Sequence, residues 1–240
     1  MSSPIALLAA LALGGCLSMS GLVQADDAVQ DQSASLKASN TSVQGESQTS
    51  TTPWRGQVNA LRARFERIST TLSGDEQAEA LEVLADEARG LGERYPSRAD
   101  VLVWQGIIFA SEARARGGVS ALGLAKEARE VLERAVKLDS EGVQGSAYVT
   151  LGALYDRAPG WPLAFGDEAT AERMFERALA IRPTGIDVHF YFATFLEEEG
   201  RLDEAWAHLK RAIVGQSRKA RVATDEALRE LAIRRLAKRG

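Results

Sequence analysis

The side chains in this 240-residue chain that could perform acid–base or metal chemistry are few and scattered. Its two histidines, His189 and His208, and its single cysteine, Cys16, exclude a histidine-rich metal site, a thiolate cluster and an intramolecular disulfide. Asp167 or Glu197 could act as a general base, but neither lies in a motif that positions a nucleophile, a phosphate or a zinc ion. We therefore expect no catalytic activity, no resident metal and no cofactor.

Structural roles are the simpler interpretation of these polar residues. His189 falls on a packing position of a helix, which predicts a buried or hydrogen-bonded ring, whereas His208 is expected to face water from the next helix. The three consecutive glutamates that begin at Glu197 could bind a cation. Such a run just before a glycine is more typical of a solvated helix end.

The composition indicates a globular, all-helical protein. Apolar residues make up 45% of the chain and charged residues 26%, with six prolines beside abundant Ala, Leu, Glu and Arg. A net charge of −4 argues against a nucleic-acid partner held by overall positive charge. Residues 216–240 carry eight basic and three acidic side chains, which we expect to face water and to favour the dipole of a last helix. Attraction to an acidic partner or an anionic lipid is the alternative.

The first 25 residues read as an export signal. Residues 5–13 are continuously apolar but too short to cross a membrane comfortably, and small residues precede a predicted cleavage site after Ala25. Alternatively, residues 13–16 resemble a bacterial lipobox, in which Cys16 would be acylated. We expect a periplasmic or secreted protein, or one that is lipid-anchored in the cell envelope, with membrane contact only if Cys16 is acylated. The polar residues 26–53 are expected to form a disordered tether.

Helical periodicity organises the remaining residues, 54–240. The 3–4 spacing of apolar side chains predicts a first helix over 54–72. Ser73 with Glu76 predicts a capping box at the start of the second helix, and Thr224 is expected to cap the last one.

Three segments share one spacing: a small residue, a large residue four positions later, and a small residue three positions after that. A small residue lets two antiparallel helices approach closely, while the large one fills the gap beside it. Because one helix pair leaves an apolar face open, at least three pairs must stack. The three sets are Ala128-Leu132-Ala135, Ala171-Phe175-Ala178 and Ala205-Leu209-Ala212.

These segments resemble the tetratricopeptide repeat, a helix–turn–helix unit of 34 residues. The resemblance covers about residues 100–217, and the chain is similar to a group of small exported bacterial proteins with such repeats. It implies an all-α solenoid of about three helix hairpins, with capping helices over 54–95 and 224–238. The copy that matches best reads Tyr148-x2-Leu151-Gly152-x2-Tyr155, then Ala171-x3-Phe175-x2-Ala178, then Pro183.

The resemblance also implies a concave groove, lined by the first helix of each repeat, that holds a peptide or protein partner. Three adjacent aromatic residues cannot all face one side of a helix, so at least one of Phe190 and Tyr191 should reach the groove. The alternative is that both pack on the neighbouring helix. Inward positions are Ser146, Val149, Ala153 and Asp156 in one repeat, then Asp187, Phe190, Thr194 and Glu197, with Tyr191 beside them, in the next.

Two turns are longer than the family spacing, and both should emerge at the same end of the solenoid. One contains Gly117 and Gly118; the other, residues 157–166, contains Trp161 and Phe165. We expect Trp161 to fold back with Phe165 and plug that end. The alternative is an exposed anchor for a partner.

The predicted function is a non-catalytic protein-interaction or scaffolding module of the bacterial cell envelope that holds a peptide or protein in its groove. The alternative is a small-ligand-binding accessory component of a transport system, with a pocket beneath the Trp161 turn.

Overall fold

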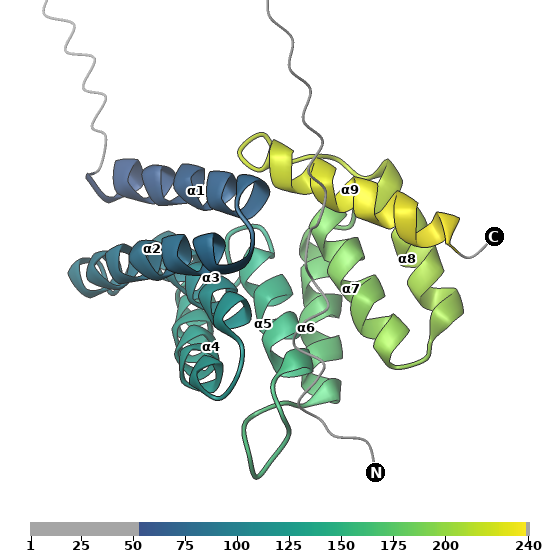
Figure 1. Ribbon diagram of the computed structural model, residues 1–240, viewed down its shortest axis with the longest axis horizontal. Helices are drawn as coiled ribbons and strands as arrows, with labels where there is room; N and C mark the ends of the chain where they lie inside the picture. The colour runs from purple at the N-terminus through teal and green to yellow at the C-terminus, as the bar shows by residue number, and fades with distance from the viewer. Residues whose placement is uncertain (1–52, 239–240) are drawn as a thin grey trace, which may run out of the picture.

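The computed structural model describes residues 53–238, and this part of the chain contains nine α-helices and no β-strand (Figure 1). The predicted all-α fold is therefore confirmed. The predicted signal segment, Cys16 and the tether as far as residue 52 lie outside the described residues. The helices are α1 (Pro53–Thr71), α2 (Gly74–Arg94), α3 (Ala99–Arg116), α4 (Ser120–Leu138), α5 (Ser146–Arg157), α6 (Glu168–Ile181), α7 (Ile186–Glu198), α8 (Leu202–Val214) and α9 (Val222–Ala237).

The helices pair into hairpins, α1–α2, α3–α4, α5–α6 and α7–α8, and α9 follows without a partner of its own. Each first helix contacts the first helix of the next hairpin, so α1, α3, α5, α7 and α9 form the inner layer and α2, α4, α6 and α8 the outer layer. The result is the predicted all-α solenoid. No helix within residues 53–238 has both the length and the apolar character needed to cross a bilayer.

Small residues lie where paired helices approach most closely. Ala128, Ala171 and Ala205 are all fully buried, as the repeat pattern predicted. On the first helix of a hairpin, a glycine likewise allows the second helix to approach closely. A Cβ placed on Gly152 would lie 2.9 Å from the Phe175 ring, so that hairpin closes only because the Cβ is absent.

The turns inside the α3–α4, α5–α6 and α7–α8 hairpins all lie toward the lower edge of Figure 1. We call this the turn end; it comprises residues 117–119, 158–167 and 199–201. The two long turns therefore emerge together, as expected.

Local helix caps differ from the sequence prediction. Ser73 precedes α2 but its side chain makes no capping hydrogen bond. The Gln77 side chain instead donates to the Leu72 carbonyl at 2.8 Å, which closes the turn between α1 and α2. Asp167, considered as a general base, is the N-cap of α6: it accepts the Thr170 amide at 2.7 Å, and this hydrogen bond lowers the pKa of Asp167.

Gly152→Ala should lower the free energy of unfolding by about 1–3 kcal/mol, because the new methyl group would overlap the Phe175 ring. Gly123→Ala is the matched control. Gly123 lies in α4, and no atom of a neighbouring element lies within 4 Å of the position that its Cβ would occupy, so helix propensity alone should stabilise the protein by about 0.5–1 kcal/mol. Urea unfolding followed by circular dichroism measures both. Equal effects of the same sign would contradict this packing.

Candidate functional site

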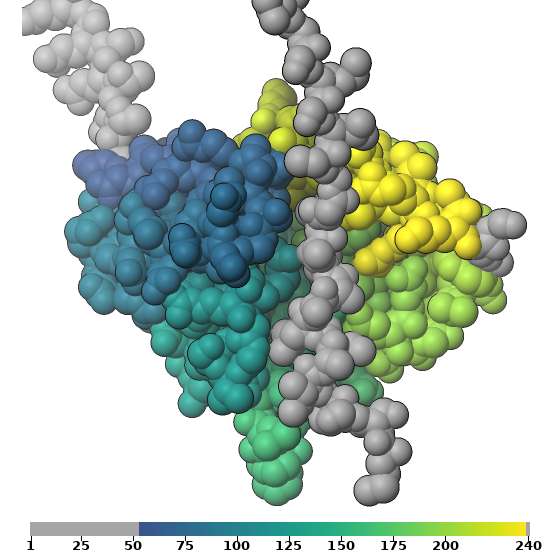
Figure 2. All heavy atoms as spheres, viewed as in Figure 1, coloured from purple at the N-terminus to yellow at the C-terminus, as the bar shows by residue number. Residues whose placement is uncertain are grey.

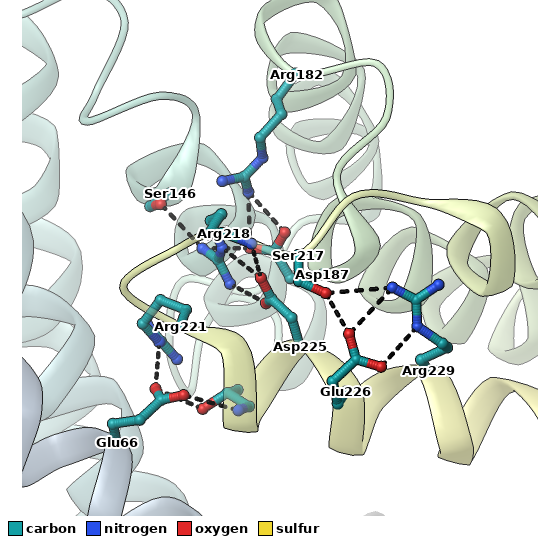
Figure 3. A network of polar contacts seen from close by, with 11 residues as sticks. Glu66, Ser146, Arg182, Asp187, Ser217, Arg218, Arg221, Asp225, Glu226 and Arg229 are labelled. Atoms are coloured by element: carbon teal, nitrogen blue, oxygen red, sulfur yellow. Dashed lines mark hydrogen bonds and ion pairs between the residues drawn. The ribbon is translucent and has the colours of Figure 1, made fainter.

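The first and last helices of the array meet in a polar clasp (Figure 3). Glu66 of α1 accepts the Thr224 amide and hydroxyl and the Arg221 Nε, each at 2.7 Å. The Arg221 guanidinium also lies 5.2 Å from the centroids of both the Phe65 and Trp104 rings. Thr224 is therefore not the N-cap of α9; its amide is capped from across the molecule by the carboxylate of Glu66.

Beside the clasp, a chain of alternating charges links α6, α7 and α9 (Figure 3). Arg182 Nη2 donates to both carboxylate oxygens of Asp187 at 2.7 Å, and Arg218 Nη1 pairs with Asp187 at 3.0 Å. Arg218 in turn donates its backbone amide and Nε to Asp225 at 2.8 and 3.0 Å. Burial alone would lower the pKa of Arg218, but the carboxylates of Asp187 and Asp225 raise it.

The five inner helices and the segment before α9 surround a cavity of about 140 Å³. Ser146, Val149, Ala153 and Asp187, all predicted to face inward, line this cavity. Tyr191, which is half-buried, lines it as well. The inner surface therefore contains a partly open pocket of mixed polarity, which residues of all five inner helices line.

Farther along α7, the predicted groove positions lie beneath α9. Phe190 is fully buried, with the Arg235 guanidinium 4.8 Å from its ring centroid. Arg235 Nη1 also donates to the Thr194 hydroxyl at 2.8 Å and pairs with Glu197 at 3.0 Å. Of the aromatic pair, Tyr191 reaches the cavity and Phe190 does not. In this conformation, α9 takes the place that a partner would have in the groove.

The remaining predicted acidic position is also engaged within the chain. Asp156 pairs with Arg157 Nε at 2.8 Å, and Arg157 Nη2 pairs with Glu198 at 2.8 Å. Burial raises the pKa of Asp156, and the positive charge of Arg157 partly offsets this rise. Glu197 and Glu198 thus bind different arginines and Glu199 is exposed. No group of three potential metal ligands occurs within residues 53–238.

The two histidines meet between α7 and α8. His189 Nε2 lies 2.8 Å from the Pro183 carbonyl, which only accepts, so His189 Nε2 donates and its Nδ1 accepts from His208 Nδ1 at 2.9 Å. The buried role predicted for His189 is confirmed. The expectation that His208 faces water is wrong, since its ring is half-buried and lies 4.7 Å from the Phe192 centroid. Burial, with His189 nearby, lowers the pKa of His208 to about 4.

The long turn between α5 and α6 presents a bare apolar tip. Trp161 is 89% exposed and Leu163 75% exposed, whereas Phe165 packs edge-on against Tyr155 with ring centroids 5.6 Å apart. The Arg129 guanidinium of α4 covers the Phe165 ring at 4.5 Å. Phe165 thus folds back as expected. The expectation that Trp161 folds back with it and plugs the end is wrong, because the Trp161 side chain is exposed at the tip of the turn.

Backbone hydrogen bonds hold the base of this turn. The Gly166 amide donates to the Pro159 carbonyl at 2.8 Å, and the Asp167 amide donates to the Tyr155 carbonyl at 3.0 Å. A Cβ on Gly166 would lie 1.9 Å from the Ala158 carbonyl oxygen, so the two arms of the turn touch only because glycine stands there. We call residues 158–166 the prong; in Figure 2 it projects from the lower edge of the molecule.

Sequence reasoning missed three further apolar side chains at the turn end. Val119 is 86% exposed in the α3–α4 turn, Leu163 lies in the prong, and Leu202, the first residue of α8, directly follows the α7–α8 turn. Together with Trp161 they are four of the nine large hydrophobic side chains exposed within residues 53–238. For Val119 and Leu163 the available signal was an apolar residue next to a glycine or a proline inside a turn; Leu202 follows Arg201 and had no such signal.

An apolar pocket of about 120 Å³ lies beside the prong, between α3, the start of α4 and the end of α5. Its walls are mostly alanine, and Arg114 and Arg157 complete them. Ala158 both lines this pocket and begins the prong. A pocket thus lies near the root of the turn, although Trp161 does not cover it.

No protein-family model matches the chain, and no curated protein matches it. Ten chains of solved structures do match. One of them, described as "Crystal structure of MamA", has 17% sequence identity and a TM-score of 0.43, over 67% of this chain and 86% of that one. Partner and function therefore have to come from this chain's own residues.

Glu66→Gln should loosen the contact between α1 and α9, because it removes the charge that pairs with Arg221 inside the clasp. Breaking a largely buried ion pair costs about 3 kcal/mol. Amide hydrogen exchange over residues 222–237 should accelerate accordingly. Glu87→Gln is the control, since Glu87 forms an exposed pair with Arg64 and should change exchange in α9 little. Equal protection of α9 in both variants would count against the clasp.

The free energy of unfolding should fall as the pH drops from about 6.5 toward 4. The folded state holds the pKa of His208 near 4, below its ordinary value of 6.5, so the unfolded state takes up the proton first. His189 shifts in the same direction. His208→Gln should flatten this decline in pH-dependent urea titrations. His189 is the only other histidine in the sequence and is present in both proteins, so the change in slope reports His208; an unchanged slope would refute the assignment.

Proposed function

We propose that this chain is a non-catalytic protein-interaction module of the bacterial cell envelope that engages its partner through the turn end. The observation that carries this proposal is Trp161, 89% exposed at the tip of a braced turn. An exposed tryptophan is costly to leave in water, and tryptophan is the side chain most enriched among the anchors of protein interfaces.

The bracing of the prong favours binding. Phe165 holds its base against Tyr155, and backbone hydrogen bonds close the base, so Trp161 and Leu163 are presented in one arrangement. A preorganised anchor loses less conformational entropy when it docks than a flexible one. Val119, in the α3–α4 turn, and Leu202, at the start of α8, are also exposed apolar side chains.

The inner surface is a weaker candidate for peptide binding. The clasp between Glu66, Arg221 and Thr224 brings α1 against α9, and α9 covers Phe190. A peptide could use Phe190, Thr194 and Glu197 only after α9 had been displaced. The turn end needs no such rearrangement.

The inner cavity also gives limited support to the alternative of a small-ligand component in transport. Arg218 and Arg221 line it, but Asp187, Asp225 and Glu66 already neutralise them. Each of these buried charges already has a counter-charge within the chain, so none of them requires a ligand. We therefore favour the protein-interaction module over the ligand-binding component.

The envelope location is part of the proposal and rests on the N-terminal sequence. The apolar segment 5–13, followed by Ala25 or by the lipobox-like residues that end at Cys16, supports export. Mass spectrometry of the mature N-terminus distinguishes cleavage from acylation.

A photo-crosslinking residue at position 161 should capture a partner in intact envelopes, because Trp161 lies at the proposed contact. The matched control places the same residue at Val214, which is 80% exposed at the other end of α8. Crosslinked species identified by mass spectrometry should form from position 161 and not from 214. Failure at 161, or equal capture at both positions, would overturn the proposal.

A further inference from the structure

The turn end carries both a projecting apolar group and an apolar hollow. Trp161 and Leu163 form the projection, and the pocket beside Ala158 forms the hollow. We infer that two copies of this chain pair through their turn ends, each placing Trp161 in the apolar pocket of the other. This inference rests on the proposed function, because it names a partner for the same surface.

The pocket has the chemistry that an indole requires. Alanines such as Ala121 and Ala125 give it an apolar wall, Leu154 contributes a large aliphatic side chain, and no carboxylate lines it among the described residues. Arg114 and Arg157 belong to the same lining. An indole that enters here therefore meets a mainly apolar wall.

Trp161 is held away from the pocket of its own chain. The base of the prong is fixed on the α4 side, where Arg129 covers Phe165, and the Gly166 amide bonds to Pro159. The tip consequently projects outward and is 89% exposed, although its pocket begins only three residues earlier at Ala158. An external copy can reach the pocket without disturbing this brace.

The prong lies next to the pocket, and this arrangement suits a pair of copies related by a two-fold axis. An isologous interface requires that the donating and accepting groups lie on one surface, so that a single rotation completes both contacts. Here Ala158 belongs to the prong and to the pocket wall at once. A two-fold axis beside the turn end therefore places each prong opposite the pocket of the other copy.

Charge is consistent with this pairing. The prong itself, residues 158–166, contains no charged side chain, and Asp167 and Glu168 follow it directly. The pocket lining contains two arginines, Arg114 and Arg157. Arg157 is already paired with Asp156 and Glu198, so an uncharged prong can enter the pocket without burying a new unpaired charge.

The interface is small, and this sets the expected affinity. Each aromatic side chain buries roughly 150–250 Å². Two Trp161 side chains therefore bury about 300–500 Å² in total. With Leu163 and the pocket walls the interface stays below the roughly 1,200 Å² of standard stable complexes. We therefore expect a reversible dimer with a dissociation constant in the range of about 10–100 µM.

Sedimentation velocity of the purified protein between about 1 and 200 µM spans this range and tests the inference. The wild-type protein should shift from monomer to dimer. Trp161→Ser, at an exposed position, should fold normally and weaken association at least ten-fold. Ala125→Phe should weaken it comparably by filling the pocket while Trp161 stays intact. Val214→Ser is the matched control, since Val214 is similarly exposed at the opposite end and should dimerise like the wild type.

Crosslinking locates the contact. The photo-crosslinking residue at position 161 is introduced into unlabelled protein, which is then mixed with ¹⁵N-labelled protein. Peptides that join position 161 to residues 110–125 or 150–158 of the labelled chain are expected.

A protein that stays monomeric, or a dimer that Trp161→Ser leaves unchanged, overturns the inference. Trp161-dependent sedimentation with phosphatidylethanolamine–phosphatidylglycerol vesicles, without dimer formation, also overturns it and points to a membrane. Capture of a different envelope protein from position 161 by a monomeric chain would retain the proposed function and reject this inference alone.

Discussion

The architecture depends on one carboxylate, Glu66, which joins the first helix of the array to the last. Its two oxygens accept the amide and hydroxyl of Thr224 and the Nε of Arg221. An array of stacked hairpins normally leaves an open concave surface. Here the curvature accumulated from α1 to α9 is large enough for the two ends to touch, and the clasp joins them across the inner surface (Figure 1).

Ion pairs and apolar burial together hold the last helix in place. Within α9, Leu228 and Ala232 are buried, and Leu231 and Leu236 are partly buried against the core. Arg235 pairs with Glu197 of α7, and Asp225 binds Arg218, which pairs with Asp187 of α7. Buried pairs contribute little net stability but are costly to break singly. The basic character of residues 216–240 is thus largely used inside the molecule, where sequence reasoning placed these charges in water.

Local patterns predicted the fold well because helix pairing leaves a periodic trace. The alanines at 128, 171 and 205 marked the close approaches, and the structure buries all three. The clasp was not predictable in the same way, since Glu66 and Thr224 are 158 residues apart and meet only through the summed rotation of every hairpin. Thr224 therefore suggested a local cap, the role that a threonine before Asp225 and Glu226 normally indicates.

In the candidate site too, local helix geometry was predictable from the sequence, whereas contacts between distant helices were not. Val149 and Ala153 were placed inward correctly from helix geometry, and Tyr191, expected beside the inward positions, also reaches the cavity. Phe190 was offered to a partner because nothing in the sequence indicates that Arg235 covers it. The orientation of Trp161 depends on which aromatic residue of its turn finds a partner: Phe165 packs on Tyr155 and leaves Trp161 outside.

Closure also limits how this architecture can evolve. An open solenoid lengthens by duplicating a hairpin, because each unit needs only its two neighbours. In this protein an additional hairpin between α1 and α9 would carry Glu66 away from Arg221 and Thr224, leaving a buried guanidinium without its counter-charge. An added hairpin would therefore break the clasp, whereas a longer turn at the turn end would leave it intact.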